Sequence, residues 1–190
     1  MARLGCKCGH TMGGSECPSP YSLYVYYSNE VETAMAEYAG LRLMDFIMNW
    51  DEQHECRKDF MNRKEPVEYW YCTECGRVYE LQALSRGHWL RVYSKMEEVA
   101  EPLDKDTLVK LYVFSDVYCE NILETDPDIL LSEFVQKFET DYFVSEDERV
   151  VYAFNKNDGT LLLAYKLEEV LPSKLPENFD YQEYTKGGEV

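Results

Sequence analysis

The chain has 190 residues, with 36 Asp and Glu against 19 Lys and Arg, so its formal net charge is −17. Hydrophobic residues make up 45% of the chain and aromatic residues 14%, which is too much apolar material for a disordered acidic protein. So large an acidic excess disfavours nucleic acid as a partner, because affinity for the phosphate backbone depends on Lys and Arg. The composition predicts a folded protein that binds basic partners.

The first half of the chain contains patterns typical of a strand followed by two helices. The aromatic run at residues 23–27 predicts a strand. Asn29, followed three residues later by Glu32, forms a capping arrangement that begins a helix. Apolar residues between 43 and 50 recur every three or four positions, as on one helical face, and Gly40 can divide the segment into two helices.

Further strands are predicted along the rest of the chain. Residues 67–71 and 77–81 form two strands joined by a cysteine-containing turn, and residues 89–96 form a third. In the second half, two apolar runs flank an Asp-Gly turn and predict a hairpin over residues 150–167. The segment after Leu171 is rich in Pro and Gly and has little to bury, so we expect a flexible tail over residues 172–190.

The two halves resemble one another in sequence. Residues 111–116 match residues 24–29 at an offset of 87, and the offset shortens toward the end of the chain. These matches predict an α+β fold in which a zinc-ribbon-containing strand–helix–strand–strand unit is followed by a similar zinc-free α+β unit. A duplication explains this pattern, and two unrelated sheets of like composition are the alternative. The predicted boundaries are residues 1–100 and 101–171.

Seven cysteines, an odd number, lie mostly in closely spaced pairs, which favours metal thiolates over disulfides. Cys72-x-x-Cys75-Gly76 has the spacing of a zinc knuckle, and Cys6-x-Cys8-Gly9 supplies a second knuckle near the N-terminus. The predicted ligands of a single Zn²⁺ are therefore Cys6, Cys8, Cys72 and Cys75. The Cys-x-Cys spacing is unusually tight, so His10 or Cys17 remains an alternative ligand.

A zinc ion held by four thiolates has no open position for water, so the predicted site is structural and not catalytic. No Gly-rich phosphate loop and no Ser-His-Asp spacing is visible in the sequence. His54 and Cys56 lie in a charged segment where a solvated surface is the simpler interpretation. The sequence therefore predicts a protein without enzymatic activity.

The acidic residues concentrate in the second half, where residues 114–148 contain eleven carboxylates and one opposing lysine. A surface of this kind can steer a basic protein toward it, with aromatic side chains as buried anchors. The residues predicted to contact this partner are Asp116, Glu120, Glu124, Asp126, Asp128, Tyr118, Tyr142 and Phe143. The alternative interpretation is a solvated surface that keeps the protein soluble.

No stretch approaches the length of about 18 apolar residues that a membrane helix needs, and the N-terminus has no secretion-type apolar core. These features predict a soluble cytoplasmic protein that does not contact a membrane. The sequence indicates no oligomeric state.

The chain resembles a group of small acidic bacterial zinc-ribbon proteins. The features that carry this resemblance are the two knuckles, the residues Tyr27-Ser28-Asn29 before a helix, and the strands around Tyr79 and Tyr93. This resemblance covers residues 3–99 and implies the zinc site. The charge pattern is similar to that of immunity proteins, which neutralise toxins, and implies an immunity protein, antitoxin or nucleic-acid mimic that occludes a basic partner. The alternative is a zinc-ribbon adaptor in a nucleic-acid or transcription complex, supported by the basic residues Arg57, Lys58, Arg63 and Lys64.

Overall fold

The computed structural model describes residues 3–13, 16–48, 67–81, 89–99 and 105–170. Its strands are β1 (Arg3–Gly5), β2 (Thr11–Gly13), β3 (Ser22–Tyr27), β4 (Val67–Tyr71), β5 (Val78–Leu81), β6 (Trp89–Lys95), β7 (Val109–Ser115), β8 (Thr140–Val144), β9 (Val150–Asn155) and β10 (Leu161–Val170). Its helices are α1 (Ser28–Glu37), α2 (Leu43–Met48), α3 (Asp116–Thr125) and α4 (Leu131–Gln136), with a 3₁₀ turn at Lys105–Thr107.

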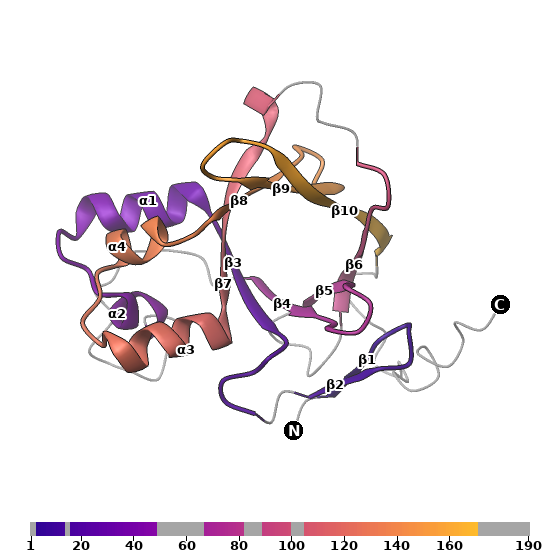
Figure 1. The fold of residues 1–190 in the computed structure, drawn as a ribbon, viewed down its shortest axis with the longest axis horizontal. Helices are drawn as coiled ribbons and strands as arrows, with labels where there is room; N and C mark the ends of the chain where they lie inside the picture. Colours follow the sequence, from indigo (N-terminus) through magenta and orange to yellow (C-terminus); the bar gives the residue numbers. More distant parts are fainter. Residues whose placement is uncertain (1–2, 14–15, 49–66, 82–88, 100–104, 171–190) are drawn as a thin grey trace, which may run out of the picture.

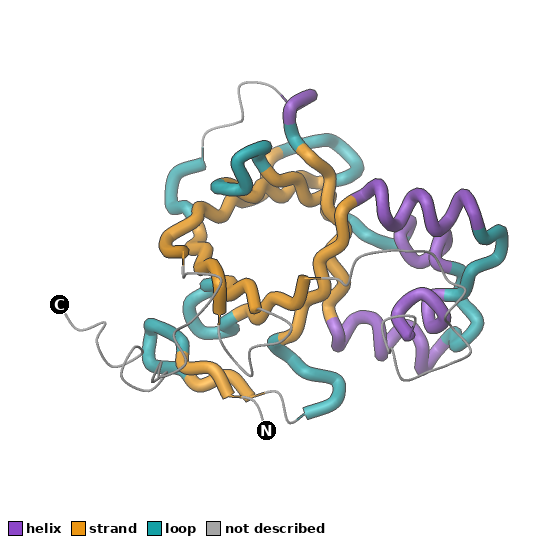
Figure 2. Tube along the Cα trace, turned by 180° about the vertical axis from the view of Figure 1, so that it is seen from behind, coloured by secondary structure: helices purple, strands orange, loops and turns teal. Residues whose placement is uncertain are grey.

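Eight of these strands form one closed barrel in the order β10-β6-β5-β4-β3-β7-β8-β9 (Figure 1). All neighbouring strands are antiparallel. The four helices lie together on one side of the barrel, beside β3 and β7 (Figure 2). The hairpin β1–β2 forms a separate two-stranded sheet. In the part of the chain that the structure describes, no helix is long and apolar enough to span a membrane.

The predicted fold class is wrong. The expected α+β arrangement, a zinc-ribbon unit followed by a zinc-free unit, does not form, because strands from both halves close into a single mostly-β barrel. Strand β3 pairs with β7, and β6 pairs with β10, so each half completes the sheet of the other. An eight-stranded sheet that closes leaves no unpaired edge, whereas two separate sheets would leave four. The strands and helices predicted over the described residues are confirmed. The predicted capping by Asn29 is wrong, because α1 begins at Ser28 with Tyr27 as its N-cap and without a side-chain hydrogen bond to the cap. The predicted tail over residues 172–190 lies outside the described residues.

The two halves share an order of elements, strand–helix–helix–strand–strand–strand, but at an offset of 88 in the first elements and not 87. Helix α1 begins at Ser28 and α3 begins at Asp116, 88 residues later. The hydrogen bonds between the halves follow this offset, since Leu43 N donates to Ile129 O at 2.9 Å and Leu131 N donates to Leu41 O at 2.8 Å. A shift of one residue exchanges the two faces of a strand. Only the offset of 88 therefore aligns residues that point into the barrel in one half with residues that point into the barrel in the other half.

The outer side of the barrel packs against the helices through an aromatic core. Tyr26 of β3 and Phe114 of β7 point toward the helices, with ring centroids 4.9 Å apart. Phe114 also contacts Phe134 of α4, edge to face at 5.1 Å. Alternate residues of the same strands point into the barrel, where Val25 and Val113 line its interior. The lumen therefore has a wall of its own, separate from the helical core.

Candidate metal centre and barrel lumen

Two tight turns carry the four predicted cysteine ligands. In the first, Cys6 N donates to His10 O at 2.7 Å and Gly9 N donates to Cys6 O at 2.8 Å. In the second, Gly76 N donates to Cys72 O at 2.8 Å. Gly9 and Gly76 have φ angles of +92° and +73°, a conformation that residues with a side chain rarely adopt. The glycines thus allow each chain segment to reverse directly after its second cysteine.

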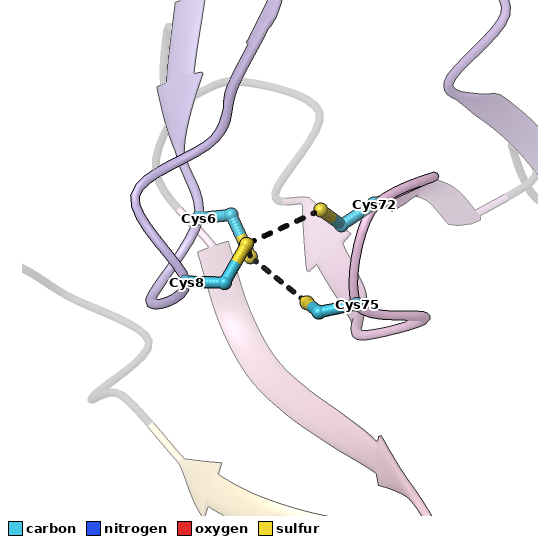
Figure 3. Close-up of side chains that lie close together, drawn as sticks. All are labelled: Cys6, Cys8, Cys72 and Cys75. Carbon is cyan, nitrogen blue, oxygen red and sulfur yellow. Dashed lines mark hydrogen bonds between the residues drawn. The ribbon is translucent and has the colours of Figure 1, made fainter.

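The structure brings the four cysteines together, as the sequence predicts (Figure 3). Their sulfur atoms all lie within 4.8 Å of one another. The separations are 3.3 Å between Cys6 and Cys8, 3.4 Å between Cys6 and Cys75, and 3.7 Å between Cys8 and Cys72. Tetrahedral zinc thiolates with bonds of about 2.3 Å have sulfur–sulfur separations of about 3.8 Å, whereas a disulfide bond is about 2.0 Å long. The cluster can hold one metal ion.

Polar groups around the cluster orient its sulfurs. The hydroxyl of Tyr79 donates to Cys6 Sγ at 3.2 Å and accepts the backbone N–H of Lys7 at 3.0 Å. The guanidinium of Arg77 donates to Cys75 Sγ at 3.7 Å. Donors of this kind around a metal site hold the ligands in place and offset their negative charge. Tyr79 was not a predicted site residue, although its place on a strand directly after the second knuckle is visible in the sequence.

Charges link the cluster to the C-terminal strand of the barrel. Glu168 of β10 pairs with Lys7 at 3.4 Å and with Arg77 at 3.0 Å. Burial raises the pKa of Cys6 and Cys72. Burial acts in the same direction on Cys75, but the backbone N–H of Arg77 and the neighbouring thiols outweigh it and lower the pKa of Cys75 to about 7. The cationic side chains of Lys7 and Arg77 thus lie beside the cluster, where four thiolates would place negative charge.

Apolar packing seats the N-terminal hairpin on the barrel wall. Leu4 of β1 and Met12 of β2 are fully buried, in a cluster with Trp70, Tyr79 and Val92 from β4, β5 and β6.

The two alternative ligands are not in the sulfur cluster. His10 stacks near Tyr21 at 5.9 Å, and its Nε2 is buried without a hydrogen-bond partner among the described residues. Cys17 is exposed, and its thiol is free.

The predicted partner-binding residues do not form one surface. Glu120, Glu124, Asp126 and Asp128 are exposed on α3 and the turn that follows it, and we call these four residues the acidic surface. Asp128 pairs with Arg42 at 3.0 Å. The carboxylate of Asp116 is engaged elsewhere, since it accepts the backbone N–H of Ser19 at 2.7 Å.

The three predicted aromatic anchors are partly buried and pack against other parts of the protein. Tyr118 packs inward on Phe134, with ring centroids 5.7 Å apart. Phe143 contacts Phe154, edge to face at 5.7 Å. Tyr142 lines the interior of the barrel. The other residues considered, His54, Cys56 and the basic cluster Arg57, Lys58, Arg63 and Lys64, lie outside the described residues.

The barrel encloses a cavity of about 360 Å³ that the sequence analysis missed. All eight strands contribute to its wall, which includes five tyrosines: Tyr69, Tyr71, Tyr93, Tyr142 and Tyr165. Alternation along the strands is the signal that could have indicated it, because Tyr69 and Tyr71 of β4, and Leu111, Val113 and Ser115 of β7, occupy every second position. In β3, however, both faces carry apolar or aromatic residues apart from Ser22, so alternation alone does not say which face is inside.

The fold and the cluster together define a class of protein: a closed eight-stranded antiparallel barrel with an N-terminal cysteine hairpin fixed to its outer wall. A family model described as a domain of unknown function, DUF8617, matches residues 2–169, so the chain belongs to that family. No curated protein and no solved structure matches the chain.

Proposed function

We propose that the four cysteines bind one Zn²⁺ as a structural clamp and that the protein is a non-enzymatic binding protein. The support for zinc is the donor set, since four thiolates at near-tetrahedral separations are typical of structural zinc sites. Such a shell leaves no coordination position for water or substrate. Its role is to fix the short hairpin β1–β2 to the outside of β4, β5 and β6.

For the binding activity, we propose that the acidic surface receives a basic protein, as an immunity protein or antitoxin receives its toxin. The observation that carries this proposal is the exposure of four carboxylates within nine residues, of which Asp128 pairs with Arg42. Glu120 and Glu124 are four residues apart on α3 and so share one helical face. With the net charge of −17, this surface would accelerate the encounter with a cationic partner.

The test compares the protein with a variant that carries Glu120→Lys, Glu124→Lys and Asp126→Lys. A cationic protein captured by the native protein from its own host is purified, and its association rate is measured at several salt concentrations. We expect the triple variant to associate at least tenfold more slowly, with a weaker dependence on salt. The matched control carries the three charge reversals Glu97→Lys, Glu98→Lys and Glu146→Lys at exposed residues outside the acidic surface.

Equal association rates of the native protein and the triple variant would refute the acidic surface. Binding of duplex DNA or RNA at physiological salt would instead favour the adaptor in a nucleic-acid complex. Nothing in the described residues favours that second function, because its cationic cluster lies outside them.

A further inference from the structure

The lumen of the barrel has the size and lining of a small-molecule site. Its volume of about 360 Å³ falls at the lower end of the range of roughly 300–1,000 Å³ found for ligand pockets. Eight strands make the smallest common barrel that can enclose one small ligand. Apart from the five tyrosines and Ser115, the wall consists of Leu and Val side chains. An occupant would thus meet aromatic faces and aliphatic groups.

Tyrosine hydroxyls supply polar positions in this wall. Within the described part of the chain, the hydroxyls of Tyr71, Tyr142 and Tyr165 make no hydrogen bond. All three side chains line the same cavity. Burial, followed by the effect of the neighbouring Tyr71, raises the pKa of both Tyr142 and Tyr165. Three adjacent hydroxyls without protein partners can receive the polar group of a ligand.

A buried carboxylate lies in the same lumen. Glu80 of β5 is only 8% exposed and lines a second cavity of about 210 Å³, which shares five wall residues with the first. Its contacts are long, 3.3 Å from the Tyr69 hydroxyl and 3.6 Å from Arg91. Arg91 pairs more closely with Glu148, which lies in the turn between β8 and β9. Two carboxylates therefore share one guanidinium, and Glu80 is the less well neutralised.

A cleft beside β7 and β8 adjoins the lumen. Pairing between β7 and β8 extends only from Val109↔Val144 to Leu111↔Tyr142. Beyond this point, a cleft of about 460 Å³ shares four wall residues with the lumen, among them Val113 and Ser115. Its outer lining carries Glu139 and Asp141 against Lys137, and Lys110 pairs with Asp141 at 3.0 Å.

We propose that the barrel lumen binds a small organic cation, an aromatic or alkyl amine, that enters between β7 and β8. A cation is favoured over an anion because it would complete the neutralisation of Glu80, which is buried, and an uncompensated buried charge is costly. Tyrosine rings attract cations at their faces, and the attraction strengthens when the cation is desolvated. This inference goes beyond the proposed docking of a protein on the acidic surface and does not depend on it.

The experiment uses the full zinc-loaded chain and three indoles that differ in charge: tryptamine, neutral indole and indole-3-propionate. Calorimetric titration at constant ionic strength measures each dissociation constant. We expect tryptamine to bind at least tenfold more tightly than indole-3-propionate. In Glu80→Gln, which keeps a side chain of the same shape, we expect tryptamine binding to weaken about tenfold while indole binding stays the same.

A second set of variants locates the binding. Val113→Trp fills the lumen from β7 and should abolish binding of tryptamine, whereas Leu162→Trp places the same side chain on the exposed outside of β10 and should leave it intact. If Val113→Trp does not fold, Ser115→Phe at the opening replaces it. Absence of binding by all three indoles at millimolar concentration would overturn the proposal. Tryptamine binding that persists in the filled variant would do the same, and equal affinity for the three indoles would overturn its preference for cations.

Discussion

Removal of the metal should release the hairpin β1–β2 and leave the barrel folded. The hairpin buries two large apolar side chains, Leu4 and Met12, which contribute about 3–6 kcal/mol together. Ordering the backbone of its eleven residues, Arg3–Gly13, costs about 11–22 kcal/mol. The shortfall of about 5–19 kcal/mol includes the apparent free energy of about 10–16 kcal/mol that a structural zinc ion supplies.

The perturbations are chelation of the metal under reducing conditions and the substitution Cys72→Ser. Metal content, the number of reactive thiols and hydrogen exchange of peptides from residues 3–13 are measured before and after. We expect one Zn²⁺ per native chain and close to none in Cys72→Ser. Amides of the hairpin should then exchange at the rate of an unfolded chain, while those of β7 to β10 remain protected.

The control is Cys17→Ser, which removes an exposed thiol outside the cluster and should change neither metal content nor exchange. If the hairpin amides of the metal-free, reduced protein stay as protected as in the metal-bound form, the hairpin does not depend on the metal. Such a result would mean that packing on Trp70 and Tyr79 holds the hairpin without a metal.

Two further predictions concern the barrel. Phe114→Ala removes a fully buried ring that contacts Tyr26 and Phe134. We expect it to reduce the free energy of unfolding, measured by urea denaturation, by about 3–5 kcal/mol. The control Leu162→Ala changes an exposed side chain and should reduce the free energy of unfolding by less than about 0.5 kcal/mol. The second prediction concerns Glu148, whose pKa is lowered by the hydrogen bond from Tyr27 and, against the effect of burial, by Arg91. The resulting stability is present above the ordinary carboxyl pKa and is lost as pH falls through the lowered value, so Tyr27→Phe should flatten the loss of stability measured between about pH 5 and pH 3. Identical pH profiles of the two proteins would contradict this prediction.

The metal cluster could be predicted because its signal is local. Each knuckle is a short turn in which cysteines and a glycine stand at characteristic spacings, and four sulfurs on two turns have few other uses. The same holds for the hairpin over residues 150–167, where Asp158-Gly159 lies between two apolar runs and Gly159 adopts a φ of +71°. Such features depend on residues that are close in sequence.

The partner-binding prediction shows what sequence proximity does not provide. Asp116, Tyr118 and Glu120 are near neighbours in the chain, yet one is bound to Ser19, one is packed on Phe134 and only Glu120 is exposed. Tyr142, predicted as a surface anchor, lines the lumen. Whether a side chain on a strand or helix points into the core or to solvent depends on the elements that pack against it. The pattern of charges along the sequence does not reveal these contacts.

Local sequence patterns were enough to predict the strands β3, β4, β5, β6, β9 and β10, the helices α1 and α2 and the two knuckles, because hydrophobic periodicity and turn residues act over a few positions. The closure of the strands into one barrel depends instead on long-range pairing, β3 with β7 and β6 with β10. In the sequence Ser22–Tyr27, both faces of the strand are apolar or aromatic, so the periodicity is the same whichever face lies inside. Contacts between strands that are about 70–90 residues apart in the sequence settle this choice, and with it the existence of a tyrosine-lined lumen.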